Sequence, residues 1–254
     1  MIPEWLIGTW ERTYIQRRRK DIPPHKQQED TIHPTQNSPI ETSHLNKPDS
    51  TIKVRYIQTP WAFIDIRSKL VNESESGEQP MAFAGVTTVL QRKDFVPLVH
   101  WHSCLDLDEK NIDCYERWRE AEDGTPRLTQ DTGYFQKCSE TDRHVYMEYD
   151  PDRTLLEQWV RVDNAKEFLA VRSKDGNTVL ILAGIYFGYA DQVNKMFVSG
   201  IVQGGDYLQK ENWIVETNAV DFRKVGYALE IPSGEWTVLK GSTLPLSTID
   251  CIQV

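Results

Sequence analysis

Strand-like runs recur along almost the whole chain, and no other feature restricts the fold as strongly. Runs of roughly five to nine residues, rich in β-branched and aromatic side chains, are bounded by Gly, Pro, Asn and Asp, which is typical of β-strands. Helical periodicity is nearly absent, and Asp175-Gly176 supplies the positive φ angles of a tight hairpin turn. About fifteen such runs predict an all-β antiparallel barrel or sandwich instead of alternating strands and helices.

The composition excludes several classes of function. A formal net charge of −9 opposes a broad nucleic-acid surface, because phosphate contacts need basic side chains. The four cysteines are widely spaced and form no C-x-x-C pair, so we expect reduced thiols and no zinc motif. No apolar run approaches the ~18 residues of a membrane span, and no secretory signal pattern opens the sequence. We therefore expect a cytoplasmic protein with no cofactor, no membrane span and no nucleic-acid partner.

Two polar stretches interrupt the strand material. Residues 21–50 combine five prolines with many polar side chains, which predicts a flexible insertion. Residues 108–130 form an acidic surface insertion, in which Tyr115 to Glu122 are compatible with a short surface helix. We expect the remaining sequence to form one domain over 1–254, with a homodimer left open.

Several motifs look familiar as a set. They are G-T-W-E-R at 8–12, Y-I-Q-T-P-x-x-F-x-D-I-R at 56–67, F-A-G-V-T-T at 83–88, W-H at 101–102 and L-E-Q-W-V-R at 156–161. In this order they resemble a lipocalin-like (calycin) family of largely uncharacterised bacterial and fungal proteins that includes a yeast casein-kinase-interacting protein. The resemblance implies a calycin-type antiparallel β-barrel, either one enlarged barrel or two packed ones. It brings no catalytic residues, and the kinase partnership belongs to a distant branch.

The first strand predicts a closed barrel end. In lipocalin-like barrels a Trp stacked with an Arg closes the base, and we assign this role to Trp10 and Arg12. Strand alternation places Tyr14 and Gln16 on the same face as these two residues. If that face points inward, the barrel has a polar wall.

The segment at 61–67 also alternates clearly. One face carries Trp61, Phe63, Asp65 and Arg67. The other face is purely aliphatic, so we expect the strand to be covered on both sides. Asp65 and Arg67 then either form a buried ion pair or present their charges to a ligand.

The segment at 99–106 holds the densest group of reactive side chains. His100 and His102 share one face, and Trp101 lies on the other. With the histidines inward, His102 is a candidate general acid or base. With Trp101 inward, both histidines lie in water. A zinc or iron site completed by Asp106 or Asp108 is a less favoured alternative, and we expect no metal.

The segment at 155–161 places Glu157, Trp159 and Arg161 on one face. A glutamate beside Trp in an apolar chamber favours its neutral form and can donate a proton. A salt bridge from Glu157 to Arg12 or Arg161 is the favoured alternative.

Two functions follow as expectations. The first is a cofactor-independent isomerase or cyclase that holds an apolar metabolite of terpenoid or polyketide type in the barrel. Proton transfer is assigned to Asp65, His102 and Glu157, and substrate binding to Arg12, Tyr14, Trp61, Phe63, Arg67, Trp101 and Trp159. The second is a lipocalin-type protein that binds a small molecule or a partner without turnover.

Overall fold

A computed structural model shows an eight-stranded antiparallel barrel joined to a six-stranded antiparallel sheet. The structure describes residues 2–19, 34–36, 39–40, 42–69, 81–110, 112–124, 131–138, 144–205, 207, 210–219, 229 and 234–244. The expected all-β antiparallel barrel is confirmed. Among the described residues the chain from Phe168 onward forms an open sheet, not a second barrel.

The chain up to Asp163 supplies the whole barrel. Its strands are β1 (Gly8–Arg17), β2 (Ile52–Gln58), β3 (Ala62–Lys69), β4 (Met81–Leu90), β5 (Leu98–Asp106), β6 (Asp131–Lys137), β7 (Val145–Tyr149) and β8 (Leu155–Asp163). Neighbours in sequence pair with one another, and β1 also pairs with β8 to close the circle. At this closure Gly8 has a φ of 131°, and a β-carbon there would lie 2.4 Å from the Asp163 carbonyl oxygen. Glycine therefore permits the close approach of β1 and β8.

The chain from Phe168 onward forms the sheet, in the order β13-β12-β11-β10-β9-β14. Its strands are β9 (Phe168–Ser173), β10 (Thr178–Ala183), β11 (Tyr186–Asp191), β12 (Met196–Val202), β13 (Trp213–Asn218) and β14 (Trp236–Val238), with 3₁₀ turns at Gln203–Gly205 and Lys210–Asn212. The predicted hairpin at Asp175-Gly176 joins β9 to β10, and Gly176 has a φ of 76°. The strand predicted at 248–254 lies outside the described residues.

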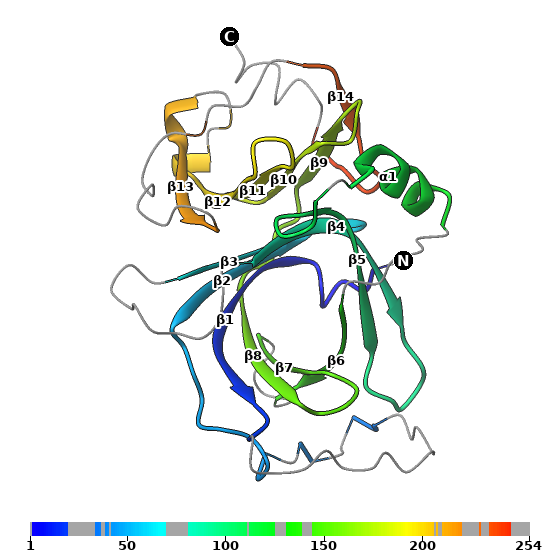
Figure 1. The fold of residues 1–254 in the computed structure, drawn as a ribbon, viewed down its shortest axis with the longest axis vertical. Helices are drawn as coiled ribbons and strands as arrows, with labels where there is room; N and C mark the ends of the chain where they lie inside the picture. Colours follow the sequence, from blue (N-terminus) through cyan, green and yellow to red (C-terminus); the bar gives the residue numbers. More distant parts are fainter. Residues whose placement is uncertain are drawn as a thin grey trace.

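The sheet lies over one side of the barrel, against β2, β3 and β4 (Figure 1). Outward-facing aliphatic residues of β3, such as Ile64 and Ile66, join one apolar cluster with Ile181 of β10 and Phe197 of β12. The barrel strand β3 is thus covered on both faces, as its sequence predicts. The opposite face of the sheet has its own apolar cluster around Trp213.

Helix α1 (Cys114–Glu122) connects β5 to β6 within the predicted acidic insertion. The helix is present as expected, but it is not merely a surface element. Trp118 is fully buried, packs against Trp61 and donates its indole N–H to the Gly176 carbonyl oxygen at 3.1 Å. The helix therefore ties the barrel to the β9–β10 turn. It is also too short and too polar to cross a membrane, and no described helix has the length and apolarity to do so.

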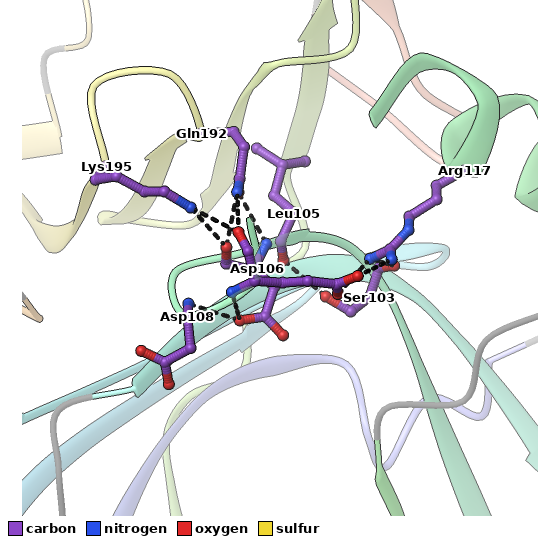
Figure 2. A network of polar contacts seen from close by, with 8 residues as sticks. Ser103, Leu105, Asp106, Asp108, Arg117, Gln192 and Lys195 are labelled. Atoms are coloured by element: carbon purple, nitrogen blue, oxygen red, sulfur yellow. Dashed lines mark hydrogen bonds and ion pairs between the residues drawn. The ribbon is translucent and has the colours of Figure 1, made fainter. Parts of the chain in front are cut away.

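Polar contacts hold the end of β5 between the two halves of the molecule (Figure 2). The side chain of Gln192 accepts from the Asp106 amide at 2.9 Å and donates to the Asp106 carbonyl oxygen at 2.8 Å. Lys195 donates to the Glu109 carbonyl oxygen at 2.9 Å, and Arg117 of α1 binds the Glu109 carboxylate. These contacts fix the relative position of the barrel, the helix and the β11–β12 turn.

The insertion at 21–50 is only partly described. Residues 21–33, 37–38 and 41 lie outside the described chain. The described part packs on the barrel exterior, where Asp49 bridges Ile15 and Leu45 bridges Arg18. Leu45 is buried in an outer apolar cluster, so this part is not a free loop.

Candidate functional site

The inward faces of the barrel strands combine aromatic rings with buried charges. The aromatic residues of this interior cluster are Trp10, Tyr56, Phe63, Phe83, Trp101, Phe135, Tyr146 and Trp159. The buried charged side chains among them are Arg12, Asp65, Arg67, Glu148 and Glu157, and the half-buried Asp131 lines the same interior. The predicted inward placement of Phe63, Asp65 and Arg67 on β3 agrees with this arrangement, as does that of Trp159 and Glu157 on β8.

Arg12 and Glu157 form a fully buried ion pair between the two strands that close the barrel. The Arg12 Nη1 atom lies 2.5 Å from Glu157 Oε1, and each side chain is only 1% exposed. The register of β1 and β8 places the two residues diagonally, because Arg12 is opposite Trp159. The favoured alternative of a structural salt bridge to Glu157 is therefore the observed arrangement.

Asp65 and Arg67 also pair with each other, two residues apart on one face of β3. The Asp65 Oδ2 atom accepts from Arg67 Nε at 3.1 Å and from Nη2 at 2.9 Å. The remaining terminal nitrogen, Nη1, lies 3.6 Å from Glu157 Oε1. Arg67 is thus engaged by two carboxylates, and the guanidinium stacks near Phe83 as well.

A small cavity lies beside these pairs. The space open to the centre of a water molecule is about 10 Å³, so the cavity admits about one water molecule. Its lining consists of Tyr56, Asp65, Arg67, Phe83, Trp101, Asp131, Phe135, Glu148 and Trp159. Two buried polar atoms of this lining, Asp65 Oδ1 and Trp159 Nε1, have no hydrogen-bond partner among the described residues. The centre of the barrel can therefore still accept and donate hydrogen bonds.

Glu148 and Asp131 extend the site beyond the residues singled out in the sequence. Burial raises the pKa of the Glu148 carboxyl well above its ordinary value, and the nearby carboxylates of Glu157 and Asp131 raise it further. Burial also raises the pKa of Asp131, although the Arg67 guanidinium opposes the shift. The neutral form of Glu148 is thus favoured by its surroundings.

We expect the stability of the protein to report the protonation of Glu148. The carboxyl binds a proton more tightly in the folded state than in the unfolded state, so its stabilising contribution is complete below the unfolded pKa and is lost as pH rises through the folded pKa. Glu148→Gln removes this loss. Urea unfolding at several pH values between 5 and 8 should show a shallower decline for the variant, by a fraction of the roughly 1.4 kcal/mol per pH unit that one proton supplies.

Glu235→Gln is the matched control. The Glu235 side chain is 72% exposed and pairs with Lys174 on the surface, outside the barrel interior. This variant should leave the pH dependence of the wild type unchanged. Equal slopes for the wild type and Glu148→Gln would contradict the proton assignment. A residual slope in Glu148→Gln is expected, since burial also raises the pKa of Asp65 and Asp131.

Tyr14 does not face the interior, and this prediction is wrong. A β-bulge between Arg12 and Tyr14 shifts the register, so that Tyr14 lies opposite Gln158. The extra residue, Thr13, reverses the alternation for the rest of the strand. Tyr14 instead packs on the barrel exterior near Met147.

Trp61 and His102 also lie outside the barrel. Trp61 precedes β3, packs in the cluster between barrel and sheet, and carries Lys240 over its ring. On β5 it is Trp101 that points inward, where it donates to the Tyr56 hydroxyl at 3.1 Å. His102 faces outward and contacts the Thr88 hydroxyl at 2.9 Å. An interior proton-transfer role for His102 and an interior binding role for Trp61 are therefore excluded by their positions.

The alternative metal site near these histidines has no support in the described geometry. Asp106 Oδ1 accepts hydrogen bonds from the Asp108 and Glu109 amides and thereby caps the turn after β5. In the part of the chain that the structure describes, no three His, Cys, Asp or Glu side chains converge as metal ligands.

The base of the barrel is closed by Trp10, but with a different arginine from the expected one. Arg161 of β8 lies over the Trp10 ring at 5.6 Å and reaches the Trp5 carbonyl oxygen at 3.4 Å. The Trp10 indole donates to the Leu6 carbonyl oxygen at 2.8 Å. Arg12, the arginine expected to stack on Trp10, is instead used in the ion pair with Glu157.

Comparison with known proteins assigns no function to the chain. No protein-family model matches the chain, and no curated protein matches it. The crystal structure of an uncharacterised protein from Saccharomyces cerevisiae is similar, with a TM-score of 0.49 and 12% identity. That similarity covers 92% of this chain and 98% of the yeast chain.

Proposed function

We propose that this protein binds a small molecule at the centre of its barrel. The observation that carries the proposal is the cavity at Asp65 and Trp159, which combines aromatic walls, buried charges and polar atoms without partners among the described residues. Buried polar groups are nearly always satisfied by protein, water or ligand, and binding sites typically combine apolar walls with a few placed polar groups. A bound molecule that supplies a donor to Asp65 and an acceptor to Trp159 would complete both.

The indole N–H signals of the eight tryptophans offer a direct test. The Trp159 signal is assigned in the ¹H–¹⁵N correlation spectrum by its loss in Trp159→Phe. We expect at least one compound in a screen of small cations, neutral molecules and anions to shift this signal. The Trp118 signal is the internal control, because Trp118 lies outside the barrel and is bonded to Gly176. Absence of any shift at Trp159 across all three compound classes would contradict the proposal.

A second candidate is proton-transfer catalysis by a cofactor-independent isomerase or cyclase. Glu148 favours it, because a buried carboxyl with a raised pKa can act as a general acid beside a bound substrate. A terpenoid or polyketide would need the aromatic walls to move, since the present cavity admits about one water molecule. Loss of turnover in Glu148→Gln with retained binding would favour this candidate.

We also propose that the chain has the lipocalin-like affiliation indicated by its motifs. The support is the G-x-W strand, whose Trp10 closes the barrel beneath Arg161.

We propose a cytoplasmic location for this protein on separate grounds, the state of its cysteines. Cys104 and Cys114 are buried free thiols, which suits a reducing compartment.

A further inference from the structure

We propose that the molecule bound in the barrel is an organic cation, with a primary ammonium group placed among Asp65, Asp131 and Glu148. The inference rests on the proposed binding function and specifies its ligand class. The three carboxyl groups and the guanidinium of Arg67 line the same cavity. Acidic groups therefore exceed basic groups on the surface that a ligand would touch.

Among the described residues that line the cavity, Arg67 carries the only guanidinium, and this group is already used. Arg67 donates to Asp65 through Nε and Nη2, and its Nη1 lies beside Glu157. Arg12, behind the cavity, is held by Glu157 at 2.5 Å. To gain a charged donor, an anionic ligand would have to break one of these buried pairs, which is strongly unfavourable, so the donor left to it is the neutral Trp159 N–H.

The cavity lining does, in contrast, offer an acceptor atom without a hydrogen-bond partner among the described residues. This atom is the buried Oδ1 of Asp65. Asp65 is only 3% exposed, so open solvent does not satisfy it. An ammonium group carries three donors and no acceptor, so it can satisfy Asp65 Oδ1, while the acceptor for Trp159 Nε1 must come from another part of the ligand or from water. An ammonium head group is about as large as the one water molecule that the cavity admits, and the carbon chain attached to it enters only if the aromatic walls move.

The aromatic walls suit the same ligand class. Five rings line the cavity, from Tyr56, Phe83, Trp101, Phe135 and Trp159. A cation near the face of an aromatic ring gains electrostatic attraction, and the gain is larger where water is excluded. A neutral or anionic head group of the same size would lack this attraction.

Binding of a cation should also cause the Glu148 carboxyl to release its proton to solvent. The carboxyl is surrounded by Glu157, Asp131 and Asp65, whose charges disfavour its ionisation, and by Arg67, which favours it. A positive head group adds a second favourable charge, so Glu148 ionises more readily when the ligand is bound. Affinity for the amine should then rise between pH 6 and pH 8 while the amine itself stays protonated.

The test uses three probes of nearly equal size: propylamine, propanol and propionate, each titrated into the full-length protein at constant ionic strength while the Trp159 indole signal is followed. We expect propylamine to bind at least ten-fold more tightly than propanol, and propionate to give no saturable shift. Preferential binding of propanol or propionate would overturn the cation assignment and leave the proposed binding function intact. No saturable shift with any probe would overturn both.

Two variants locate the charge effect. Asp131→Asn should weaken propylamine binding several-fold, while any weak propanol binding stays the same. Glu148→Gln should remove the increase of propylamine affinity between pH 6 and pH 8, and Glu235→Gln, exposed on the surface, should keep it. Thermal unfolding of each variant confirms that it is folded. Unchanged propylamine affinity in folded Asp131→Asn would contradict the placement of the ammonium group.

Discussion

Replacing Arg12 with alanine is expected to lower the free energy of unfolding by about 3–5 kcal/mol, because it leaves Glu157 buried without its main partner. The pair lies between β1 and β8, the first and last strands of the barrel, so its loss weakens the closure itself. Arg67 cannot replace it fully, since the shortest distance from Arg67 to Glu157 is 3.6 Å and Arg67 already binds Asp65. Urea unfolding of the two proteins at neutral pH measures the difference.

The double variant Arg12→Met with Glu157→Leu separates the ion pair from the space that it fills. Apolar replacement of a whole buried pair is often neutral or stabilising, whereas removal of one partner is costly. We therefore expect the double variant to regain most of the stability lost in Arg12→Ala. The control is Lys174→Ala, which removes a pair exposed by 74% and 72% and should change stability by less than about 1 kcal/mol. A loss below about 1 kcal/mol in Arg12→Ala would show that the barrel closes without this pair.

The second large effect is expected at the contact between barrel and sheet. Ile64→Ala should lower the free energy of unfolding by about 2–5 kcal/mol, because Ile64 is fully buried and its removal leaves a cavity. Gly188 of β11 faces this side chain, and a β-carbon at 188 would lie 2.3 Å from Ile64 Cγ2. Gly188→Ala alone should therefore also destabilise, by about 1–3 kcal/mol through overpacking.

The two changes should compensate each other. In Ile64→Ala only the β-carbon of residue 64 remains, and it lies 3.4 Å from the position that the new methyl group would take, which is ordinary contact. We expect the double variant to be more stable than the sum of the single losses indicates, with a coupling energy of about 0.5–3 kcal/mol. Ile64→Val keeps the Cγ2 atom and is the matched control. Gly188→Ala should be no better tolerated in that background. Additive losses in the double variant with alanine would contradict direct packing of these residues.

Strand alternation predicted the interior correctly where a strand is regular. On β3 the alternation from Phe63 to Arg67 runs without interruption, and the predicted inward residues lie inside. On β1 the prediction fails at Thr13, since a single extra residue moves every later side chain to the other face. The sequence does not indicate this bulge, because the segment has no glycine, the residue whose positive φ angle marks some bulges.

The choice between the two faces of β5 could not be made from the sequence, because both carry polar and apolar residues. The structure selects Trp101 for the interior, where Tyr56 and Phe135 surround it. Glu148 was missed for a different reason. It shares a face with Tyr146 on a short strand, so its inward position could be predicted, but its raised pKa comes from burial in the assembled barrel and from Glu157 and Asp131 on other strands. Only the three-dimensional assembly brings these carboxyls together.

The closure of the barrel by β1 and β8 has a consequence for synthesis of the chain. Every strand of the barrel ends by Asp163, so its circuit of hydrogen bonds can close before any strand of the sheet has left the ribosome. At that stage the outward-facing Ile57, Ile64 and Ile66 have no cover from the sheet, because their partners on β10 and β12 have not yet left the ribosome. The nascent barrel therefore exposes an aggregation-prone aliphatic surface, which is covered when the following sheet folds onto it.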